Sequence, residues 1–233
     1  MRAQPRGAEW IEEPGNYIVK LFPAGTPREA VDNEVERTGL ARQYGLEAPL
    51  VREVVERGGR LGIRFDKAFG PTFTQWMLEH LDSMVRLTAF FAHEHHEIHL
   101  HKVPELPSLK EALAKRIGSS DGDHESKAAA LKKLGEMPDG DWALHWNYTP
   151  EDMISTKDGP VIFNWGEAMR GDIMADVART AMLLERWEPR PEEREQADMV
   201  RDRIYHDYII EYLKISGRWE DELEAWKELL AYW

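Results

Sequence analysis

The chain has 233 residues with 43 acidic and 30 basic side chains, which gives a formal net charge of −13. This excess of negative charge repels a phosphate backbone over most of a protein surface, so nucleic-acid binding is disfavoured. The absence of cysteine excludes disulfides, thiolate nucleophiles and zinc sites built on sulfur.

An apolar content of 42% and nine tryptophans are enough to bury a core in one domain or in two small lobes. No apolar run approaches the roughly 18 residues that a membrane-spanning helix needs. The first ten residues, MRAQPRGAEW, lack the apolar core of a signal peptide. We therefore expect a cytoplasmic globular protein with no membrane partner.

A hairpin and a helix are predicted in the first 44 residues. Two short β-rich runs, residues 9–11 and 17–22, flank the turn sequence PGN at 14–16. From Pro27 to Tyr44 the apolar spacing suits a helix, with Thr26 as its expected N-cap.

A second hairpin is predicted from residues 50–56 and 61–65, because the RGGR sequence between them supplies the positive φ angles that a tight turn needs. The segment DKAFGP at 66–71 then reads as a connector. The remainder is mostly helical by its periodicity. This order predicts a small antiparallel sheet with one helix, followed by a larger helical part.

A motif with unusual substitutions lies near residue 150. Residues 145–152 read HWNYTPED, and Asn164 follows in the sequence VIFNWGE. The frame resembles that of the aminoglycoside phosphotransferase and choline kinase family, with a catalytic loop H-G-D-x-[HN]-x-x-N and a metal strand [IL]-D-[WF]. Against this pattern four residues differ: Gly has become Trp146, the two Asp have become Asn147 and Asn164, and the Asn has become Asp152.

The resemblance covers most of the chain. Segments with counterparts in the family lie in order from about residue 8 to residue 180, at Lys20, Glu34, 62–73, 96–99, 107–110, 137–141 and 171–179. It implies an α+β, two-lobed protein-kinase-like fold with a small-molecule site in the cleft between the lobes. The expected division is an N-lobe at 1–69 and a helical C-lobe at 70–233, which carries a catalytic-like loop at 145–152 and a metal-strand-like segment at 161–167.

Lys20 and Glu34 are implied to hold a nucleotide such as ATP. The ammonium group would reach the phosphates, and the helix glutamate would orient it. No G-x-G-x-x-G precedes Lys20, since only RGAE at 6–9 occupies the place of a phosphate-covering turn, with residues 1–5 before it. The resemblance therefore predicts loose nucleotide binding or none.

Asn147 stands at the position of the family's catalytic base. In phosphoryl transfer an aspartate there accepts the proton of the attacking hydroxyl, whereas an amide has no useful basicity. The sequence predicts that Asn147 orients an acceptor without taking its proton. Loss of a general base typically lowers the rate by about 10²- to 10⁴-fold.

Asp152 and Asn164 occupy the two positions with which the family holds magnesium, with their residue types exchanged. One carboxylate and one amide carbonyl retain the ligand charge of the pair, so the resemblance implies a weakened Mg²⁺ site. Glu167, three residues after Asn164, is expected at the surface or behind the ligands.

The loop around Trp146 leaves two alternatives open. The indole either fills space that phosphates or an acceptor would use, or packs into the core. His145 is expected to brace the loop from inside rather than to replace the base.

Five histidines lie within residues 93–101, and His95 and His99 are one helical turn apart, a spacing that suits a metal. The resemblance instead favours structural roles for His96 and His99, and no acidic third ligand stands at typical zinc spacing. We therefore expect no transition metal here. Asp172 and Asp176 are expected to cap and anchor the helix after the metal strand.

The leading functional hypothesis is a divergent member that has lost efficient phosphoryl transfer and binds a small molecule or nucleotide. The alternative is an active kinase of a hydroxylated or amino metabolite that uses ATP and Mg²⁺. A third hypothesis is proton-transfer chemistry without nucleotide, with Glu151, Asp152 and Glu167 as acids and bases.

Overall fold

A computed structural model describes residues 7–187 and 194–233. The described residues form helices and strands in an α+β arrangement, as predicted. Arg6, the first residue of the RGAE sequence that was expected at the place of a phosphate-covering turn, and residues 1–5 before it fall outside the described part of the chain.

The chain divides by packing into two compact units. The first unit comprises Met1–Ser83 with Asn147–Glu167, and the second comprises Met84–Trp146 with Ala168–Trp233. This grouping follows packing, whereas the lobe boundary at residues 69 and 70 followed the sequence pattern and stays a prediction.

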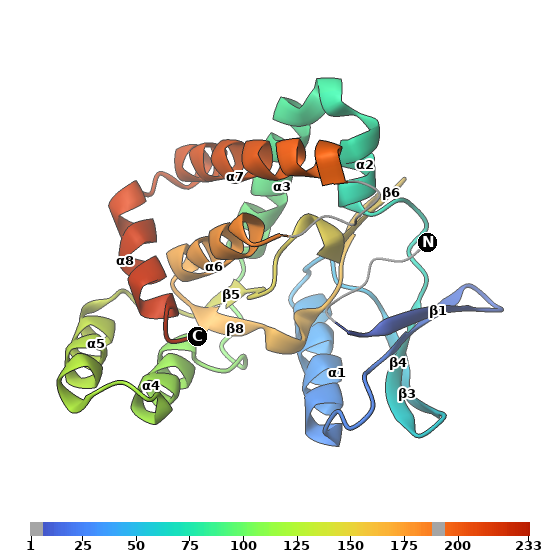
Figure 1. Cartoon of the computed structure of the whole chain (residues 1–233). Helices are drawn as coiled ribbons and strands as arrows, with labels where there is room; N and C mark the ends of the chain where they lie inside the picture. The colour runs from blue at the N-terminus through green and yellow to red at the C-terminus, as the bar shows by residue number, and fades with distance from the viewer. Residues whose placement is uncertain (1–6, 188–193) are drawn as a thin grey trace. The chain divides into compact units, whose positions relative to one another are not determined.

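The first unit is built on a four-stranded antiparallel sheet (Figure 1). Its order is β1-β2-β4-β3, with strands β1 Glu9–Glu13, β2 Tyr17–Leu21, β3 Val51–Arg57 and β4 Arg60–Asp66. Both predicted hairpins are confirmed. The turn between β3 and β4 places Gly58 and Gly59 at φ 56° and 72°, a conformation that residues with a side chain adopt only under strain.

Helix α1, Arg28–Gln43, covers part of this sheet and is the helix that the sequence predicted. Thr26 is not its N-cap. The N-cap is Pro27, and the Thr26 hydroxyl instead donates a hydrogen bond to the carbonyl of Pro23 at 2.8 Å. The threonine side chain is therefore used by the preceding turn, and the helix begins one residue later than a threonine cap would require.

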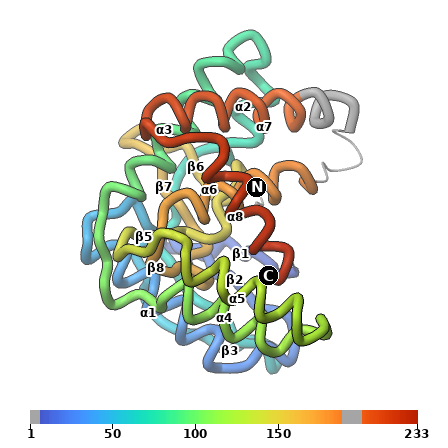
Figure 2. The backbone as a smooth tube through the Cα atoms, turned by 90° about the vertical axis from the view of Figure 1, so that its left-hand side faces the viewer, coloured from blue at the N-terminus to red at the C-terminus, as the bar shows by residue number. Residues whose placement is uncertain are grey.

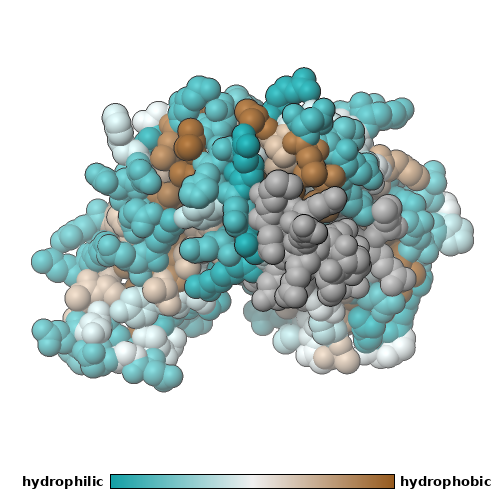
Figure 3. Space-filling view, turned by 45° about the horizontal axis from the view of Figure 1, so that its top comes forward, coloured by the Kyte–Doolittle hydropathy of each residue, from teal (hydrophilic) through white to brown (hydrophobic). Residues whose placement is uncertain are grey.

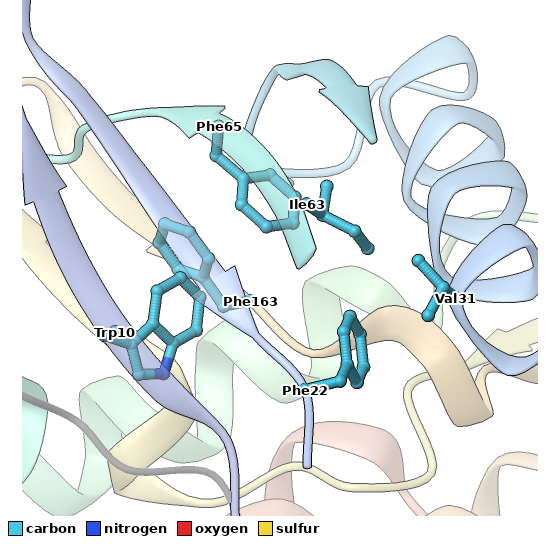
Figure 4. Packing of buried hydrophobic residues seen from close by; sticks show 6 residues of the cluster. All are labelled: Trp10, Phe22, Val31, Ile63, Phe65 and Phe163. Atoms are coloured by element: carbon cyan, nitrogen blue, oxygen red, sulfur yellow. The ribbon is translucent and has the colours of Figure 1, made fainter. Parts of the chain in front are cut away.

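The core of the first unit is aromatic (Figure 4). Trp10 from β1 and Phe65 from β4 both contact Phe163, with ring centroids 5.3 Å and 5.7 Å away in edge-to-face geometry. Phe22, Val31 and Ile63 complete the buried cluster. Edge-to-face contacts of this kind add about 0.5–1.5 kcal/mol each to the stabilisation that comes from burial.

A second, smaller part of the first unit follows the sheet. It contains helix α2 Phe73–Glu79, the single-turn helices η1 Leu81–Ser83, η2 Pro150–Asp152 and η3 Trp165–Glu167, and the hairpin of β6 Met153–Thr156 with β7 Gly159–Ile162. Thr72 forms a capping box with Gln75 at the start of α2. The Ser155 amide donates to the Pro71 carbonyl at 3.0 Å, which attaches the connector after β4 to β6.

The second unit is mostly helical, as predicted for this part of the sequence. Its elements are α3 Met84–Ile98, α4 Leu109–Ser119, α5 His124–Glu136, β5 Trp142–Leu144, β8 Met169–Gly171, α6 Ile173–Glu185, α7 Arg194–Ser216 and α8 Glu220–Leu230. Helix α7 lies along α3, α6 packs against α8, and α4 lies beside α5 (Figures 1 and 2). Strands β5 and β8 pair antiparallel.

The face of the molecule in Figure 3 is mainly hydrophilic, with small separate hydrophobic areas. This agrees with a sequence in which 31% of the residues are charged. Among the described residues, no helix is both long enough and apolar enough to cross a membrane.

Gly70 tests the attachment of the connector to β6. A Cβ atom at this position would lie 1.8 Å from the Ser155 carbonyl oxygen, which is a backbone atom. We expect Gly70→Ala to lower the free energy of unfolding by about 2–3 kcal/mol in urea denaturation. The control is Gly39→Ala in α1, where nothing lies within 4 Å; it should raise stability by roughly 0.5–1 kcal/mol. Equal effects of the two substitutions would contradict this packing.

Candidate functional site

Lys20 is the fourth of the five residues of β2 and is buried, with 6% of its surface exposed. Its ammonium nitrogen Nζ lies 2.7 Å from each carboxylate oxygen of Glu34 and 2.8 Å from the amide oxygen of Asn164. A lysine ammonium has three N–H donors. The structure therefore brings the predicted pair together and uses all three donors of Lys20 within the protein.

Glu34 is held in place by its surroundings on α1. A Cβ atom at Gly166 would lie 3.0 Å from Glu34 Oε2, so a glycine there gives the carboxylate room. Arg37, one turn along α1, donates to the Gly166 carbonyl at 2.6 Å and fixes η3 against the helix. Glu167 is exposed beside this contact, as the sequence predicted for a surface position.

Asn164 connects Lys20 to Asp152. It adopts a left-handed backbone conformation at φ 67°, which asparagine tolerates better than most residues. Its amide oxygen accepts from Lys20, and its amide nitrogen donates to the carboxylate of Asp152. One amide side chain thus satisfies a cation on one side and an anion on the other.

Asp152 is 3% exposed and ends the single-turn helix η2. One of its oxygens accepts from Asn164, and the other accepts from the backbone amide of Thr149 at 3.1 Å and from the Thr149 hydroxyl. Burial raises the pKa of Asp152 from its usual value of 3.8 to about 7, against the opposing effect of these hydrogen bonds. At neutral pH this carboxyl group is only partly ionised.

These residues fit a magnesium ion poorly. Mg²⁺ needs charged or carbonyl oxygens in octahedral geometry. Both oxygens of Asp152 and the amide oxygen of Asn164 already accept hydrogen bonds, and the side of Asn164 that faces Asp152 presents N–H groups.

The predicted catalytic loop runs through both units. Asn147 belongs to the first unit and is half-buried, whereas His145 and Trp146 belong to the second unit and are fully buried. The burial of His145 is consistent with the bracing role expected for it. A role for Asn147 in orienting an acceptor stays a prediction.

Trp146 packs into the interior of the second unit. Its ring lies edge-to-face against the ring of Trp233, with 5.0 Å between the centroids. The guanidinium group of Arg116 lies over the ring of Trp233. The residue adopts a left-handed backbone conformation at φ 67°, a region that favours glycine. The second of the two alternatives for Trp146 is therefore the one observed.

Asp176 organises the interior of the second unit. Its carboxylate accepts hydrogen bonds from the backbone amides of His145 and Trp146 at 2.7 Å and 2.9 Å. It also accepts from the ring nitrogens Nε2 of His95 and His99 at 3.1 Å and 3.2 Å. The acidic partner that His95 and His99 share therefore lies far along the sequence from them. His96, for which a structural role was also expected, packs edge-to-face on the ring of Tyr212, with 5.8 Å between the ring centroids.

The histidine cluster has its hydrogen bonds satisfied without a metal. Nδ1 of His95 accepts from the Tyr208 hydroxyl at 2.7 Å, and Nδ1 of His99 accepts from Tyr212. Burial lowers the pKa of His95 to about 3, so this ring is neutral at physiological pH. His95, His99 and Asp176 lie close enough together to hold a metal ion. Each ring nitrogen of the two histidines, however, already donates a hydrogen bond to Asp176 or accepts one from a tyrosine hydroxyl.

Asp172 caps α6, as the sequence predicted. Its carboxylate accepts from the backbone amide of Met174 at 3.3 Å. It also accepts from Arg218 and from the indole nitrogen of Trp226 at 2.9 Å. The cap therefore joins the start of α6 to α8 and the loop before it.

A cavity of about 210 Å³ lies within the first unit. Trp10, Ile18, Ile154 and Phe163 supply apolar walls, and Asn164 borders it. Sequence analysis identified Asn164 and Glu151 but missed these apolar walls, because alternation along a strand shows which face is buried without showing that the face borders a cavity.

No protein-family model and no curated protein sequence matches this chain. Solved structures do. Aminoglycoside-3'-phosphotransferase of type VIII is 16% identical with a TM-score of 0.63, covering 100% of this chain and 96% of that chain. Aminoglycoside phosphotransferase APH(3'')-Id from Streptomyces rimosus is 15% identical with a TM-score of 0.54, covering 97% and 92%. A thermostable mutant of APH(4)-Ia, in a ternary complex with AMP-PNP and hygromycin B, is 15% identical with a TM-score of 0.50, covering 97% and 93%.

These likenesses show that the chain has the kinase-like fold of the aminoglycoside phosphotransferases. The predicted α+β fold, with a small antiparallel sheet and a larger helical part, is confirmed. At 15–16% identity the likeness concerns the fold.

The raised pKa of Asp152 predicts a pH dependence of stability. The folded-state pKa of about 7 lies above the usual 3.8, so the stabilising contribution of the protonated carboxyl is complete below pH 4 and is lost as pH rises towards 7. We expect the unfolding free energy of the wild type, relative to Asp152→Asn, to fall by up to about 1.4 kcal/mol per pH unit over this range and then level off. Parallel pH profiles for the two proteins, measured by urea denaturation, would contradict this.

The contacts of Asp176 predict a large loss on removal of its charge. Asp176→Asn keeps the shape of the side chain. The carboxylate accepts hydrogen bonds from four N–H groups, whereas the amide would point its own NH₂ donors at some of them. We expect it to cost about 3–5 kcal/mol of unfolding free energy, the usual effect of breaking a buried charged network. Exposed Asp158, with 81% of its side chain accessible, provides the control, since Asp158→Asn should change stability by less than about 0.5 kcal/mol. A loss below about 1 kcal/mol at Asp176 would rule out its organising role.

Proposed function

We propose that this protein binds a small molecule in the cavity of the first unit and does not catalyse efficient phosphoryl transfer. The observation that carries this proposal is the continuous set of hydrogen bonds from Glu34 through Lys20 and Asn164 to Asp152. These four residues stand where the resemblance placed the nucleotide and metal ligands. Here they bind one another.

The chemistry at Asn147 supports the loss of transfer. A kinase of this type needs a group that accepts the hydroxyl proton of the attacking substrate. An amide does not accept it at neutral pH, and the resulting loss of about 10²- to 10⁴-fold corresponds to roughly 3 to 5.5 kcal/mol of activation free energy. The poor fit of Asp152 and Asn164 to Mg²⁺ acts in the same direction, because the metal would neutralise charge on the transferred phosphoryl group.

Ligand binding is supported by the fold and by the cavity. A protein with the same fold has been solved in a complex with AMP-PNP and hygromycin B, which makes nucleotides and small polar molecules the first ligands to test here. The cavity has apolar walls with a few polar groups at its border, the usual composition of a small-molecule site.

An active kinase that uses ATP and Mg²⁺ is the second candidate. The close contact of Lys20 with Glu34 favours it, since the same pair orients nucleotide phosphates in kinases. Proton-transfer chemistry draws support from the pKa of Asp152 near 7, which suits a general acid or base. Asp152 does not line the cavity, however, whereas the adjacent Glu151 does.

Restoring the residue types of the family provides the test of phosphoryl transfer. We expect the wild type to hydrolyse ATP in the presence of Mg²⁺ no faster than buffer. The triple variant Asn147→Asp, Asp152→Asn, Asn164→Asp returns a base and moves the carboxylate to the position beside Lys20. It should hydrolyse ATP at least about 100-fold faster than the wild type, since a general base alone contributes 10²- to 10⁴-fold.

The matched control is the triple variant with Lys20→Ala added, which should lose the gain. Wild-type hydrolysis at about 1 s⁻¹ or faster, typical of an active kinase, would establish the second candidate instead. Thermal unfolding of the same proteins with ATP and Mg²⁺ separates binding from chemistry, because a ligand at 100 times its Kd adds about 2.7 kcal/mol of stability.

A further inference from the structure

The contact between Lys20 and Asn164 brings an amine against a carboxamide inside the protein. Nζ of Lys20 lies 2.8 Å from the amide oxygen of Asn164. The carbon of that carboxamide, Cγ, is one C=O bond of about 1.23 Å from the oxygen, so Nζ lies at most about 4 Å from Cγ. Reacting atoms in a near-attack arrangement are roughly 3–3.5 Å apart. A small movement of the lysine side chain therefore brings the amine to the carbon.

Both side chains extend from backbone that is fixed in position. Lys20 pairs with β1 on one side and with β4 on the other, so its backbone lies inside the sheet. Asn164 is followed by Trp165, whose indole nitrogen donates to the Ile162 carbonyl at 2.7 Å and holds the turn that carries Asn164. Fixed neighbours within one molecule react far faster than the same groups free in solution, because little orientational entropy is lost.

The surroundings of the two groups keep most water away. Lys20, Glu34 and Asn164 are all buried. The ring of Phe22 lies under the ammonium, with 4.9 Å from Nζ to the ring centroid. Water is the competitor of an amine for a carboxamide carbon, so its exclusion favours attack by Lys20 over hydrolysis of Asn164.

Each of the two nitrogens has a carboxyl group beside it. Both carboxylate oxygens of Glu34 lie 2.7 Å from Nζ of Lys20. The carboxyl group of Asp152 accepts a hydrogen bond from Nδ2 of Asn164. One group is thus placed to take a proton from the attacking amine, and the other holds the nitrogen that would leave. Groups positioned in this way speed proton-dependent reactions by about 10²- to 10⁴-fold.

We propose that Lys20 and Asn164 form an intramolecular isopeptide bond. Glu34 takes one proton from the Lys20 ammonium, and the resulting amine attacks Cγ of Asn164. The Nζ–Cγ bond forms and the Cγ–Nδ2 bond breaks. The carboxyl groups beside the two nitrogens relay a second proton from Nζ to Nδ2, which leaves as ammonia. No oxidant, reductant or cofactor is needed.

The reaction leaves no unpaired charge in the interior. The reactants are an ammonium and the carboxylate of Glu34, which form an ion pair. The products are a neutral amide and a protonated Glu34, and Nζ keeps one N–H as a hydrogen-bond donor. Asn164 borders the cavity of about 210 Å³, which gives the released ammonia space beside the site.

The bond would tie β2 covalently to the segment after β7. A covalent link between residues 20 and 164 stabilises a protein mainly by restricting its unfolded chain. It would also remove the ammonium group with which a lysine binds nucleotide phosphates. The inference goes beyond the proposed function and does not depend on which ligand occupies the cavity.

Mass spectrometry of the purified full chain tests the proposal. After incubation at neutral pH, we expect an intact mass below that of the sequence by one molecule of ammonia. A tryptic digest should contain one branched peptide that joins the fragments carrying Lys20 and Asn164, because trypsin does not cleave after an acylated lysine. Absence of this peptide after several days of incubation overturns the proposal, as does a loss of ammonia located elsewhere in the chain.

Three variants test the role of each group. Lys20→Met removes the amine and should abolish the loss of ammonia. Glu34→Gln keeps an oxygen beside Lys20 but is not a base, and it should slow ligation at least about tenfold. Lys157→Met is the matched control, since 89% of the Lys157 side chain is exposed, and it should ligate as fast as the wild type. An unchanged rate in Glu34→Gln would overturn the part assigned to Glu34. The peptide map of the wild type decides the proposal even where Lys20→Met does not fold.

Discussion

The first unit depends on the amide of Asn164, which bridges a buried cation and a buried carboxyl group. Lys20 comes from β2, Glu34 from α1 and Asp152 from η2, so this one contact joins the sheet, its helix and the segment that follows residue 147. None of the three charged groups has bulk water around it. Burying each of these groups would be strongly unfavourable without a partner, and each is stabilised by its hydrogen bonds to its neighbours in the set.

The exchange of residue types at positions 152 and 164 explains why Glu34, Lys20, Asn164 and Asp152 satisfy one another's hydrogen bonds without a metal ion. An aspartate at 164 would place a third carboxylate next to Glu34 and Asp152, and a metal ion would then be needed to balance the charge. The amide removes that charge and supplies an N–H for Asp152 instead. The substitutions at 152 and 164 are therefore mutually consistent, whereas either one alone would leave a buried group without a partner.

Local chemistry made much of the fold predictable. The PGN and RGGR turns identified both hairpins, because their positive φ angles suit few other residues. The prediction that Thr26 caps the first helix was wrong because its hydroxyl donates to the carbonyl of Pro23. The role of Asp176 was only partly predictable, since its partner His95 lies 81 residues away. The sequence did not show that the Trp10 indole nitrogen lacks an acceptor among the described residues, because this depends on how the aromatic cluster packs.

Metal binding is the most direct test of the claim that Asp152 and Asn164 bind each other rather than an ion. Mn²⁺ replaces Mg²⁺ at oxygen ligands and its free concentration is read from electron paramagnetic resonance. In the presence of AMP-PNP, we expect that adding the protein leaves the free Mn²⁺ signal at the level set by AMP-PNP alone. Stoichiometric binding of Mn²⁺ by the wild type that disappears in Asp152→Ala would contradict it.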